Sequence, residues 1–232
     1  MKIAILSDIH GNLEALKSVA GSFDELWVLG DLVNYGPDPG AVVEFVRQNA
    51  AVVVSGNHDH AIGMGVDPRC SPAFREMAQA MQAYTESVLS EDQKAYLRGL
   101  PPTARREVEG TLFFLCHAAP SDPLYTYAPA DAAFWTKEAA TADADILLVG
   151  HTHSPFILDV DGRRVVNPGS VGQAKHGAPE ARYAVWEDGV ITLKSSRYTV
   201  DDTVRKLFDL PIDRVIAARL AGVLRNGGLF TP

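Results

Sequence analysis

The chain has few cysteines and no long apolar segment. Cys70 and Cys116 are its only cysteines in 232 residues, too few for a disulfide framework or a four-cysteine zinc site. We therefore expect reduced thiols and a cytoplasmic protein. No apolar run approaches the roughly 20 residues of a membrane-spanning helix. The N-terminus reaches the charged Asp8 too early for a signal peptide, so no membrane association is expected.

Positive charge is also scarce, because 21 lysines and arginines stand against 29 acidic residues, for a net charge of −8. A protein without a broad basic surface does not hold the phosphate backbone of a long nucleic acid, so we expect no such partner. A small anionic ligand would need a local positive feature. Repeats and low-complexity segments are absent. The content of 47% hydrophobic and 22% charged residues is typical of a folded protein, and one domain over residues 1–232 is expected.

Apolar runs alternate with helical patterns in the first sixty residues, which is typical of a parallel α/β sheet. The expected strands cover residues 2–6, 25–29, 51–54, 111–116, 146–149, 156–160, 163–166, 183–187 and 190–196. Asp161-Gly162 and Asp188-Gly189 predict tight hairpins between the later strands. We expect an inserted helical segment at about 65–100 and a C-terminal helical segment at about 199–226, which Pro211 restarts.

Most of the histidines, with aspartate and asparagine beside them, lie just after predicted strands. They form the motifs Asp8-x-His10, Gly30-Asp31, Gly56-Asn57-His58-Asp59, His117 and Gly150-His151-x-His153. Loops at the carboxyl ends of strands in an open α/β sheet meet in one crevice. Histidine nitrogens together with carboxylate and amide oxygens suit manganese, iron, zinc, cobalt or nickel. The pattern therefore predicts a metal site at this crevice.

The order D-x-H, G-D-x-x-x-x-G, G-N-H-D, H and G-H-x-H resembles that of the calcineurin-like metallophosphoesterase superfamily. Asn167-Pro168-Gly169-Ser170 further resembles its small bacterial and archaeal phosphodiesterase branch, the YfcE-like proteins. The motifs extend from residue 8 to about residue 170, which is most of the chain. The resemblance implies a four-layer α/β/β/α sandwich, with two mixed sheets flanked by helices, and a phosphoesterase activity.

The resemblance also implies two divalent metal ions, with manganese favoured over iron, zinc, nickel or cobalt. The first would be held by Asp8, His10, Asp31 and His153; Asp31 would bridge to the second, which Asn57, His117 and His151 complete. Two such ions, roughly 3.5–4 Å apart, lower the pKa of a shared water and stabilise the attacking and leaving oxygens. The expected reaction is attack of a bridging hydroxide on phosphorus. His58 would protonate the leaving group or stabilise the charge of the pentavalent phosphate, and Asp59 would orient His58.

Two positions depart from the protein-phosphatase branch of the superfamily, which has Asp and Arg where this chain has Asn34 and Tyr35. The departures weigh against a phosphoprotein substrate. We therefore expect a small phosphodiester or nucleotide. A phosphomonoesterase or a protein phosphatase is the alternative enzyme. A catalytically idle protein-interaction scaffold of the same fold is the alternative of another class, and retention of His58 and all seven ligand positions argues against it.

The sequence alone assigns no substrate-binding residue and no oligomeric state. Candidates for substrate contact are Arg69, Arg75 and the loop Ser121–Tyr127. Four residues at helical spacing, Phe74, Met77, Met81 and Tyr84, are expected to form core or a lid over the site. Cys116 is interpreted as a buried, inert thiol rather than a nucleophile. His60 and His176 match no motif position and are expected at the surface.

Overall fold

The fold is built on two five-stranded mixed sheets. It is known from a computed structural model that describes residues 1–19, 21–175 and 177–228, so His176 lies outside the described residues. The first sheet has the order β10-β9-β1-β2-β3, with β1 at Lys2–Leu6, β2 at Glu25–Val28, β3 at Val52–Val53, β9 at Glu180–Glu187 and β10 at Val190–Arg197. The second has the order β4-β5-β6-β8-β7, with β4 at Thr103–Val108, β5 at Thr111–Cys116, β6 at Ile146–Leu148, β7 at Phe156–Val160 and β8 at Arg163–Asn167.

The two sheets pack face to face through large apolar side chains. Trp27 of the first sheet meets Phe113 of the second edge to face, with ring centroids 5.2 Å apart. Phe113 meets Trp186 in the same way at 5.1 Å. All three rings are almost fully buried. Edge-to-face pairs of this kind add stability beyond the area that they bury. The inter-sheet core therefore fixes how the strand ends of the two sheets face each other.

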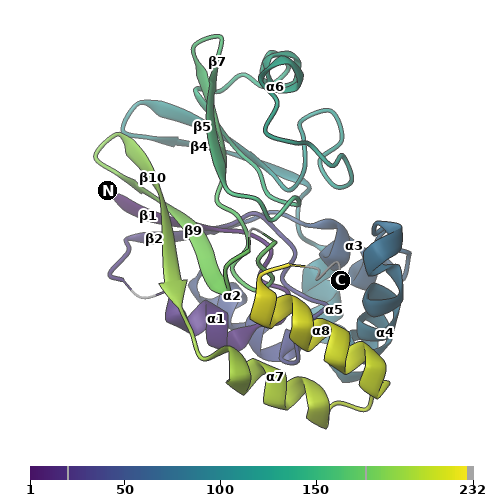
Figure 1. Ribbon diagram of the computed structural model, residues 1–232. Coiled ribbons are helices and arrows are strands. Elements are labelled where there is room, and N and C mark those ends of the chain that lie inside the picture. The colour runs from purple at the N-terminus through teal and green to yellow at the C-terminus, as the bar shows by residue number, and fades with distance from the viewer. Residues whose placement is uncertain (20, 176, 229–232) are drawn as a thin grey trace.

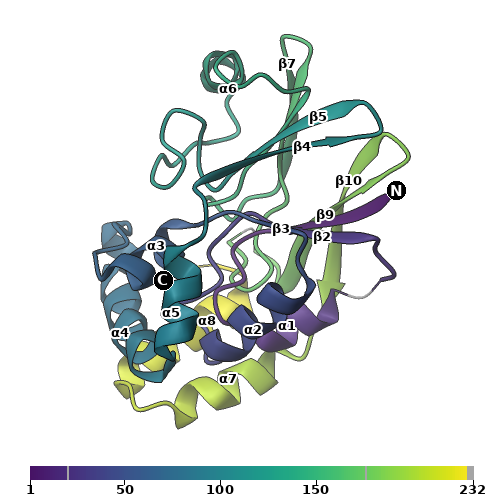
Figure 2. The ribbon, with the colours of Figure 1, turned by 180° about the vertical axis from the view of Figure 1, so that it is seen from behind.

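Helices cover the outer faces of both sheets (Figures 1 and 2). Helices α1 (Leu13–Ser18) and α2 (Pro39–Asn49) pack on the first sheet, and α6 (Ala132–Ala139) packs on the second through Trp135. The predicted α/β/β/α sandwich of two mixed sheets is thereby confirmed. Among the described residues, no helix has the length and apolar character needed to cross a membrane.

Five further helices gather at one end of the sandwich. They are α3 (Asn57–Met64), α4 (Pro72–Val88), α5 (Glu91–Arg98), α7 (Val200–Asp209) and α8 (Arg214–Asn226). The apolar residues Phe74, Met77 and Met81 of α4 pack with α7 and α8 in one buried cluster. The stripe at helical spacing is therefore core, as predicted. Helix α8 begins at Arg214 behind its cap Asp213, three residues later than the expected restart at Pro211.

Two elements were not predicted, β4 and α3. Strand β4 has the exposed run Arg105-Arg106-Glu107 and pairs only with β5 at the edge of the sheet, so it lacks the alternation of a half-buried strand. Its hairpin turn, Glu109-Gly110, has two positive φ angles, 52° and 78°, as the predicted Asp-Gly turns do. That dipeptide was the signal that could have revealed the strand. Helix α3 starts inside a polar motif that was read as a loop.

Asn12 links the first motif to three other parts of the chain. Its side-chain oxygen accepts from the backbone N–H of Ala15 (3.1 Å) and so caps α1. Its amide nitrogen donates to the carbonyl of Gly172 (2.9 Å), and Thr203 donates to its oxygen (3.0 Å). Asn12 is fully buried, so these bonds cannot be replaced by water.

We expect Asn12→Ala to lower the free energy of unfolding by about 2–4 kcal/mol, because it removes a helix cap and leaves a buried carbonyl unpaired. Urea denaturation measures the loss. Asn49→Ala, at an exposed residue that makes one hydrogen bond to Phe45, is the matched control, with an expected change within about 0.5 kcal/mol. Equal losses in the two variants would contradict the assigned role of Asn12.

Candidate metal centre

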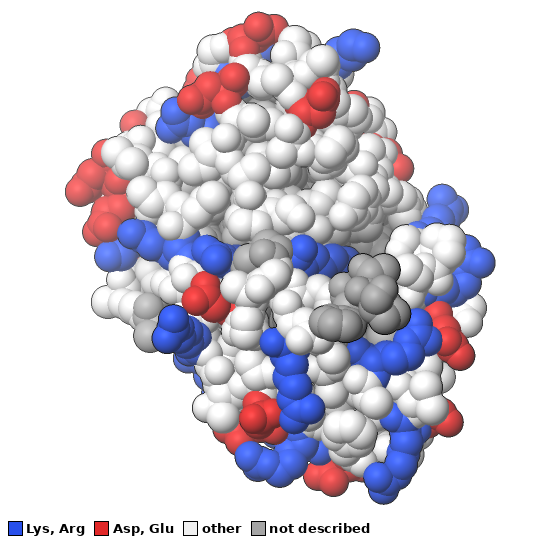
Figure 3. Space-filling model, in the orientation of Figure 1, with Lys and Arg blue, Asp and Glu red and all other residues white. Residues whose placement is uncertain are grey.

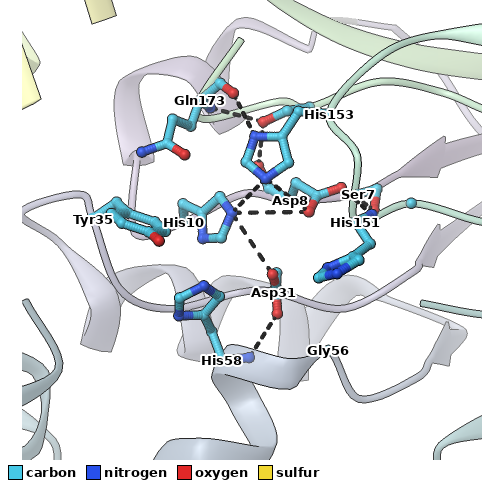
Figure 4. A network of polar contacts seen from close by, with 12 residues as sticks. Ser7, Asp8, His10, Asp31, Tyr35, Gly56, His58, His151, His153 and Gln173 are labelled. Carbon is cyan, nitrogen blue, oxygen red and sulfur yellow. Dashed lines mark hydrogen bonds and ion pairs between the residues drawn. The ribbon is translucent and has the colours of Figure 1, made fainter. Parts of the chain in front are cut away.

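All seven predicted ligand side chains lie together, just beyond the ends of β1, β2, β3, β5 and β6, with Asn57 at the first residue of α3. Figure 4 labels five of them, Asp8, His10, Asp31, His151 and His153. The contacts are His153 Nε2 to Asp8 Oδ1 at 3.2 Å, His10 Nε2 to Asp31 Oδ2 at 3.7 Å, and His117 Nε2 to Asp31 Oδ2, Asn57 Oδ1 and His151 Nδ1 at 3.2 Å each. Six of the seven residues are almost fully buried, and His151 is partly buried. Three groups of the described residues have donor atoms within 4.8 Å of one another: Asp8 with His10 and His153, Asp31 with His117 and His151, and His10 with Asp31 and His58.

Five of these seven residues have a left-handed backbone. The φ angles are 53° at Asp8, 47° at His10, 55° at Asp31, 65° at His151 and 59° at His153. Left-handed φ is uncommon for residues other than glycine and costs free energy that the surrounding structure must offset. The strain turns each side chain back over the end of its strand. It is concentrated at the motif residues, which indicates a functional site.

Three histidine rings are oriented by backbone carbonyls. Nδ1 of His10 donates to Val33 (3.0 Å), Nδ1 of His117 to Leu29 (2.8 Å) and Nδ1 of His153 to Gln173 (2.6 Å). A neutral ring that donates through Nδ1 carries its lone pair on Nε2, and carbonyl partners of this kind are typical of metal-binding histidines. The Nε2 atoms of His10 and His153 lie only 3.1 Å apart. Two lone pairs at this distance repel unless a cation lies between them.

The carboxylates of Asp8 and Asp31 are held in the same way, with one oxygen hydrogen-bonded and the other facing the histidines. Ser7 Oγ and the His151 N–H donate to Asp8 Oδ2 (2.6 and 3.1 Å), and the His58 N–H donates to Asp31 Oδ1 (2.9 Å). The other oxygen of each faces the histidines, and Asp8 Oδ1 is buried with no hydrogen-bond partner among the described residues. A buried, unpaired carboxylate oxygen is costly. The orphaned oxygen, the facing lone pairs and the nitrogen and oxygen donors together fit divalent metal ions.

The charges in the cluster are strongly coupled. Burial alone would lower the pKa of His117, but Asp31 and then Asp8 outweigh burial and raise it to about 9. Burial lowers the pKa of His151 to about 3, so that ring is neutral at neutral pH. A carboxylate pair that holds a proton on a histidine has excess negative charge, and a metal ion can take the place of that proton.

The motif glycines are required by close packing against the carboxylates. A Cβ at Gly56 would lie 2.1 Å from Asp31 Oδ1, and one at Gly150 would lie 2.0 Å from Ser7 Oγ and 2.9 Å from Asp8 Oδ2. Real Cβ atoms do not approach neighbours this closely. The backbone at these two positions therefore forms part of the wall that holds Asp8 and Asp31 in place.

His58 lies beside the cluster on the first turn of α3. Its Nδ1 is 2.8 Å from the Asn34 amide nitrogen, which donates, so the proton of the neutral ring is on Nε2. Burial lowers the pKa of His58 to about 4. The expectation that Asp59 orients His58 is wrong, because the Asp59 carboxylate instead accepts from the backbone N–H groups of Leu32 (2.8 Å) and Gly56 (3.0 Å). It therefore joins the second motif to the third, and Asn34 orients the ring.

A pocket of about 230 Å³ opens over the cluster. Its walls include Arg69, Tyr125 and Tyr127, which belong to the segments predicted to contact substrate, whereas Arg75 is exposed and lies outside it. Lys175 also lines this pocket and was not predicted. It follows the Asn167-Pro168-Gly169-Ser170 motif by five residues, which was the available signal. Cys116 is fully buried outside the pocket, and burial raises the pKa of its thiol, so it is the inert residue predicted.

Residues 1–188 match the calcineurin-like phosphoesterase superfamily domain. The chain belongs to this superfamily. It is 32% identical to a metallophosphoesterase of Sphaerobacter thermophilus, whose crystal structure superposes with a TM-score of 0.80 over 95% of this chain and 99% of that one. The hypothetical protein PH1004 of Pyrococcus horikoshii OT3, at 20% identity, shares the fold with a TM-score of 0.83 over 99% of each chain.

Two curated relatives differ in how much of the chain they match. The uncharacterized protein MJ0912 of Methanocaldococcus jannaschii is 28% identical over 228 residues, which cover 89% of this chain and 90% of that protein. The symmetrical bis(5′-nucleosyl)-tetraphosphatase of Thioalkalivibrio sulfidiphilus is 40% identical over 67 residues, 25% of each. Membership of the superfamily makes the chain a phosphoesterase, which is a hydrolase of phosphate esters, and its clusters of histidine and aspartate suit divalent metal ions.

We expect Gly56→Ala to weaken Mn²⁺ binding at least 10-fold, because the added methyl group displaces the Asp31 carboxylate. The measurement is a calorimetric titration of the metal-free protein with Mn²⁺, together with the rise in Tm that bound metal produces in the parent protein. Gly222→Ala is the matched control, since a Cβ in that part of α8 meets open space. Unchanged Mn²⁺ affinity in Gly56→Ala would contradict the described role of this glycine.

Proposed function

We propose that the protein is a dinuclear metal-dependent phosphoesterase, with a phosphodiester or a small nucleotide as substrate. The observation that carries this proposal is that His10, from one donor group, and His117, from another, both lie against the same oxygen, Asp31 Oδ2, at 3.7 and 3.2 Å. The first metal would be held by Asp8, His10, Asp31 and His153; the second by Asp31, Asn57, His117 and His151. Manganese is the metal that we favour. When bound, such a pair supplies a hydroxide nucleophile and stabilises the negative charge that develops on the phosphate.

The chain's own contribution to the reaction centres on His58. Its ring is neutral, keeps its proton on Nε2 and presents that atom at the pocket, 3.4 Å from Cys70 Sγ. We infer that this N–H donates a hydrogen bond to the leaving oxygen and thereby stabilises the negative charge that develops there as the P–O bond breaks. Asn34 holds the tautomer, since its amide can donate to Nδ1 only while Nδ1 is unprotonated. His58 therefore acts without being a metal ligand.

The substrate class follows from the pocket and from the relatives. Tyr35 occupies the position at which the protein-phosphatase branch has an arginine, and its ring is buried, with its edge toward His10 and His58 (centroids 4.9 Å apart in each pair). Aromatic walls at Tyr125 and Tyr127 suit a nucleoside better than a peptide. The match to symmetrical bis(5′-nucleosyl)-tetraphosphatases supports nucleotide substrates. A phosphomonoester is the second candidate.

Location and partners remain inferences from composition. Cys70 and Cys116 are both free thiols, which favours the reducing cytoplasm. The net charge of −8 disfavours a long nucleic acid as substrate. We propose a small phosphate ester as the only reacting partner.

We expect Mn²⁺-stimulated hydrolysis of bis-p-nitrophenyl phosphate, and a fall in kcat of about 10²- to 10³-fold in His58→Ala, the range typical of a lost hydrogen-bond donor to a developing negative charge. The metal-induced rise in Tm should persist, because His58 holds no metal. His60→Ala, two residues further along α3, is the matched control and should retain full activity. Activity retained in His58→Ala would exclude His58 as this donor. No turnover by the parent protein with Mn²⁺, Fe²⁺, Zn²⁺, Co²⁺ or Ni²⁺ would favour the scaffold.

We expect Asn34→Ala to lower kcat about 10-fold with little change in KM, because the His58 ring loses the partner that sets its orientation and tautomer. Steady-state kinetics on bis-p-nitrophenyl phosphate separates the two constants. Combined with His58→Ala, the Asn34 change should have no further effect on kcat. Additive losses in the double variant would show that Asn34 acts separately from His58.

A further inference from the structure

Two cations, Arg69 and Lys175, line the pocket. Arg69 and Lys175 form no ion pair with any residue in the described ranges, in contrast to cations such as Lys206, which contacts both Glu14 and Asp38. Each instead lies over an aromatic ring: the Arg69 guanidinium is 4.4 Å from the Tyr125 centroid and the Lys175 ammonium 4.5 Å from the Phe74 centroid. Figure 3 shows lysine and arginine side chains in a broken band across the middle of one face of this acidic protein.

Lys175 lies close in sequence to a residue whose backbone contacts the metal centre. It lies two residues after Gln173, whose carbonyl accepts from His153 Nδ1. The segment that follows is held by the end of α8, where Gly177 N–H donates to the Gly227 carbonyl (2.8 Å). Burial lowers the pKa of Lys175, whereas the carboxylate of Asp8 raises it. The ammonium is therefore partly desolvated and close enough to the cluster to interact with its charges.

Arg69 is connected to the metal centre from the opposite side. Asn57, a predicted ligand, donates from its amide nitrogen to the Pro68 carbonyl (2.7 Å). The next residue, Arg69, has a left-handed backbone with φ of 57°, and its N–H donates to Asp67 Oδ1 (2.6 Å). These contacts hold the backbone of Arg69, and its exposed side chain lies over Tyr125 at the edge of the pocket. The loop that supports Asn57 thus also places the arginine at the pocket.

With its metal ions bound, the site would carry more positive charge than the single negative charge of a phosphodiester balances. Two divalent ions, offset by the carboxylates of Asp8 and Asp31 and by one hydroxide, would leave a single net positive charge, which balances the one negative charge of a diester. Lys175 and Arg69 add two positive charges. The partly desolvated Lys175 ammonium gains stability when an anion joins it, and the exposed Arg69 at the edge of the same pocket can contact that anion. Both residues therefore favour further negative charge on the substrate.

We propose that Lys175 and Arg69 form a subsite for a second phosphate group, next to the one that is cleaved, so that the substrates are nucleotides with two or more linked phosphates. The inference rests on the proposed function and narrows its substrate class. The small volume of the pocket, about 230 Å³, lies below the usual range for ligand sites. It suits one phosphate-rich end of such a nucleotide, while the nucleoside extends past Tyr127, which is largely exposed.

The test compares the binding of two ligands to the Mn²⁺-supplemented protein by calorimetry: adenosine 5′-monophosphate and the non-hydrolysable α,β-methylene adenosine diphosphate. We expect Lys175→Gln and Arg69→Gln each to weaken binding of the diphosphate analogue about 10-fold or more, the effect of losing a charge-assisted hydrogen bond. Binding of the monophosphate should weaken less than about threefold. Lys137→Gln, the same change at an exposed residue of α6 outside the pocket, is the matched control and should bind both ligands normally.

The controls separate the subsite from a purely structural role. The Tm of Lys175→Gln should stay within about 2 °C of the parent value, since the contact with Phe74 is a single cation–π pair. Equal weakening for both ligands, or weakening for neither, would overturn the subsite. Because binding is measured without turnover, an absence of bis-p-nitrophenyl phosphate hydrolysis would refute the proposed function and leave the result on the subsite standing.

Discussion

The structure depends on one unfavourable arrangement, in which histidine lone pairs and carboxylate oxygens face each other inside the protein. The Nε2 atoms of His10 and His153 are 3.1 Å apart, and Asp8 Oδ1 is buried beside them without a hydrogen bond. These groups repel one another, so their contact does not stabilise the fold. The backbone carbonyls accept hydrogen bonds from Nδ1 and hold the histidine rings in this orientation. The free-energy cost of the arrangement is therefore present in the metal-free protein.

Both sheets hold these groups together, and the packing of the sheets offsets the free-energy cost. Parallel strands β1, β2 and β3 of one sheet and β5 and β6 of the other end at the same place, because the rings of Trp27, Phe113 and Trp186 fix the sheets face to face. Each strand end carries one or two donors, and those after β1, β2 and β6 lie on turns with a left-handed backbone. The rigid part of the molecule thus lies directly beneath the metal centre, and the helices that line the pocket lie further out.

The two mixed sheets and the gathering of the seven motif side chains beside His58 could be predicted from the sequence, because motifs after apolar strands meet at one edge of a sheet and because their order resembles that of a known superfamily. What could not be predicted depends on contacts between distant segments. The partner of His58 is Asn34 rather than the neighbouring Asp59, and proximity in sequence favoured the wrong residue. Lys175 lies in no recognised motif, and its place in the pocket depends on how its loop packs. Strand β4 was missed because an edge strand with three charged residues has no clear periodicity.

The superfamily domain ends at residue 188, yet α7 and α8 lie beyond it. These two helices pack against α4, and Gly227 at the end of α8 approaches Ala178 so closely that a Cβ there would lie 2.4 Å from its backbone nitrogen. Neither helix lines the pocket; they support the segments that carry Phe74 and Lys175, which do line it. The residues of the pocket are therefore all encoded before residue 188, and a change in the terminal helices would reach the substrate only indirectly, through the packing of α4 and of the segment around Ala178.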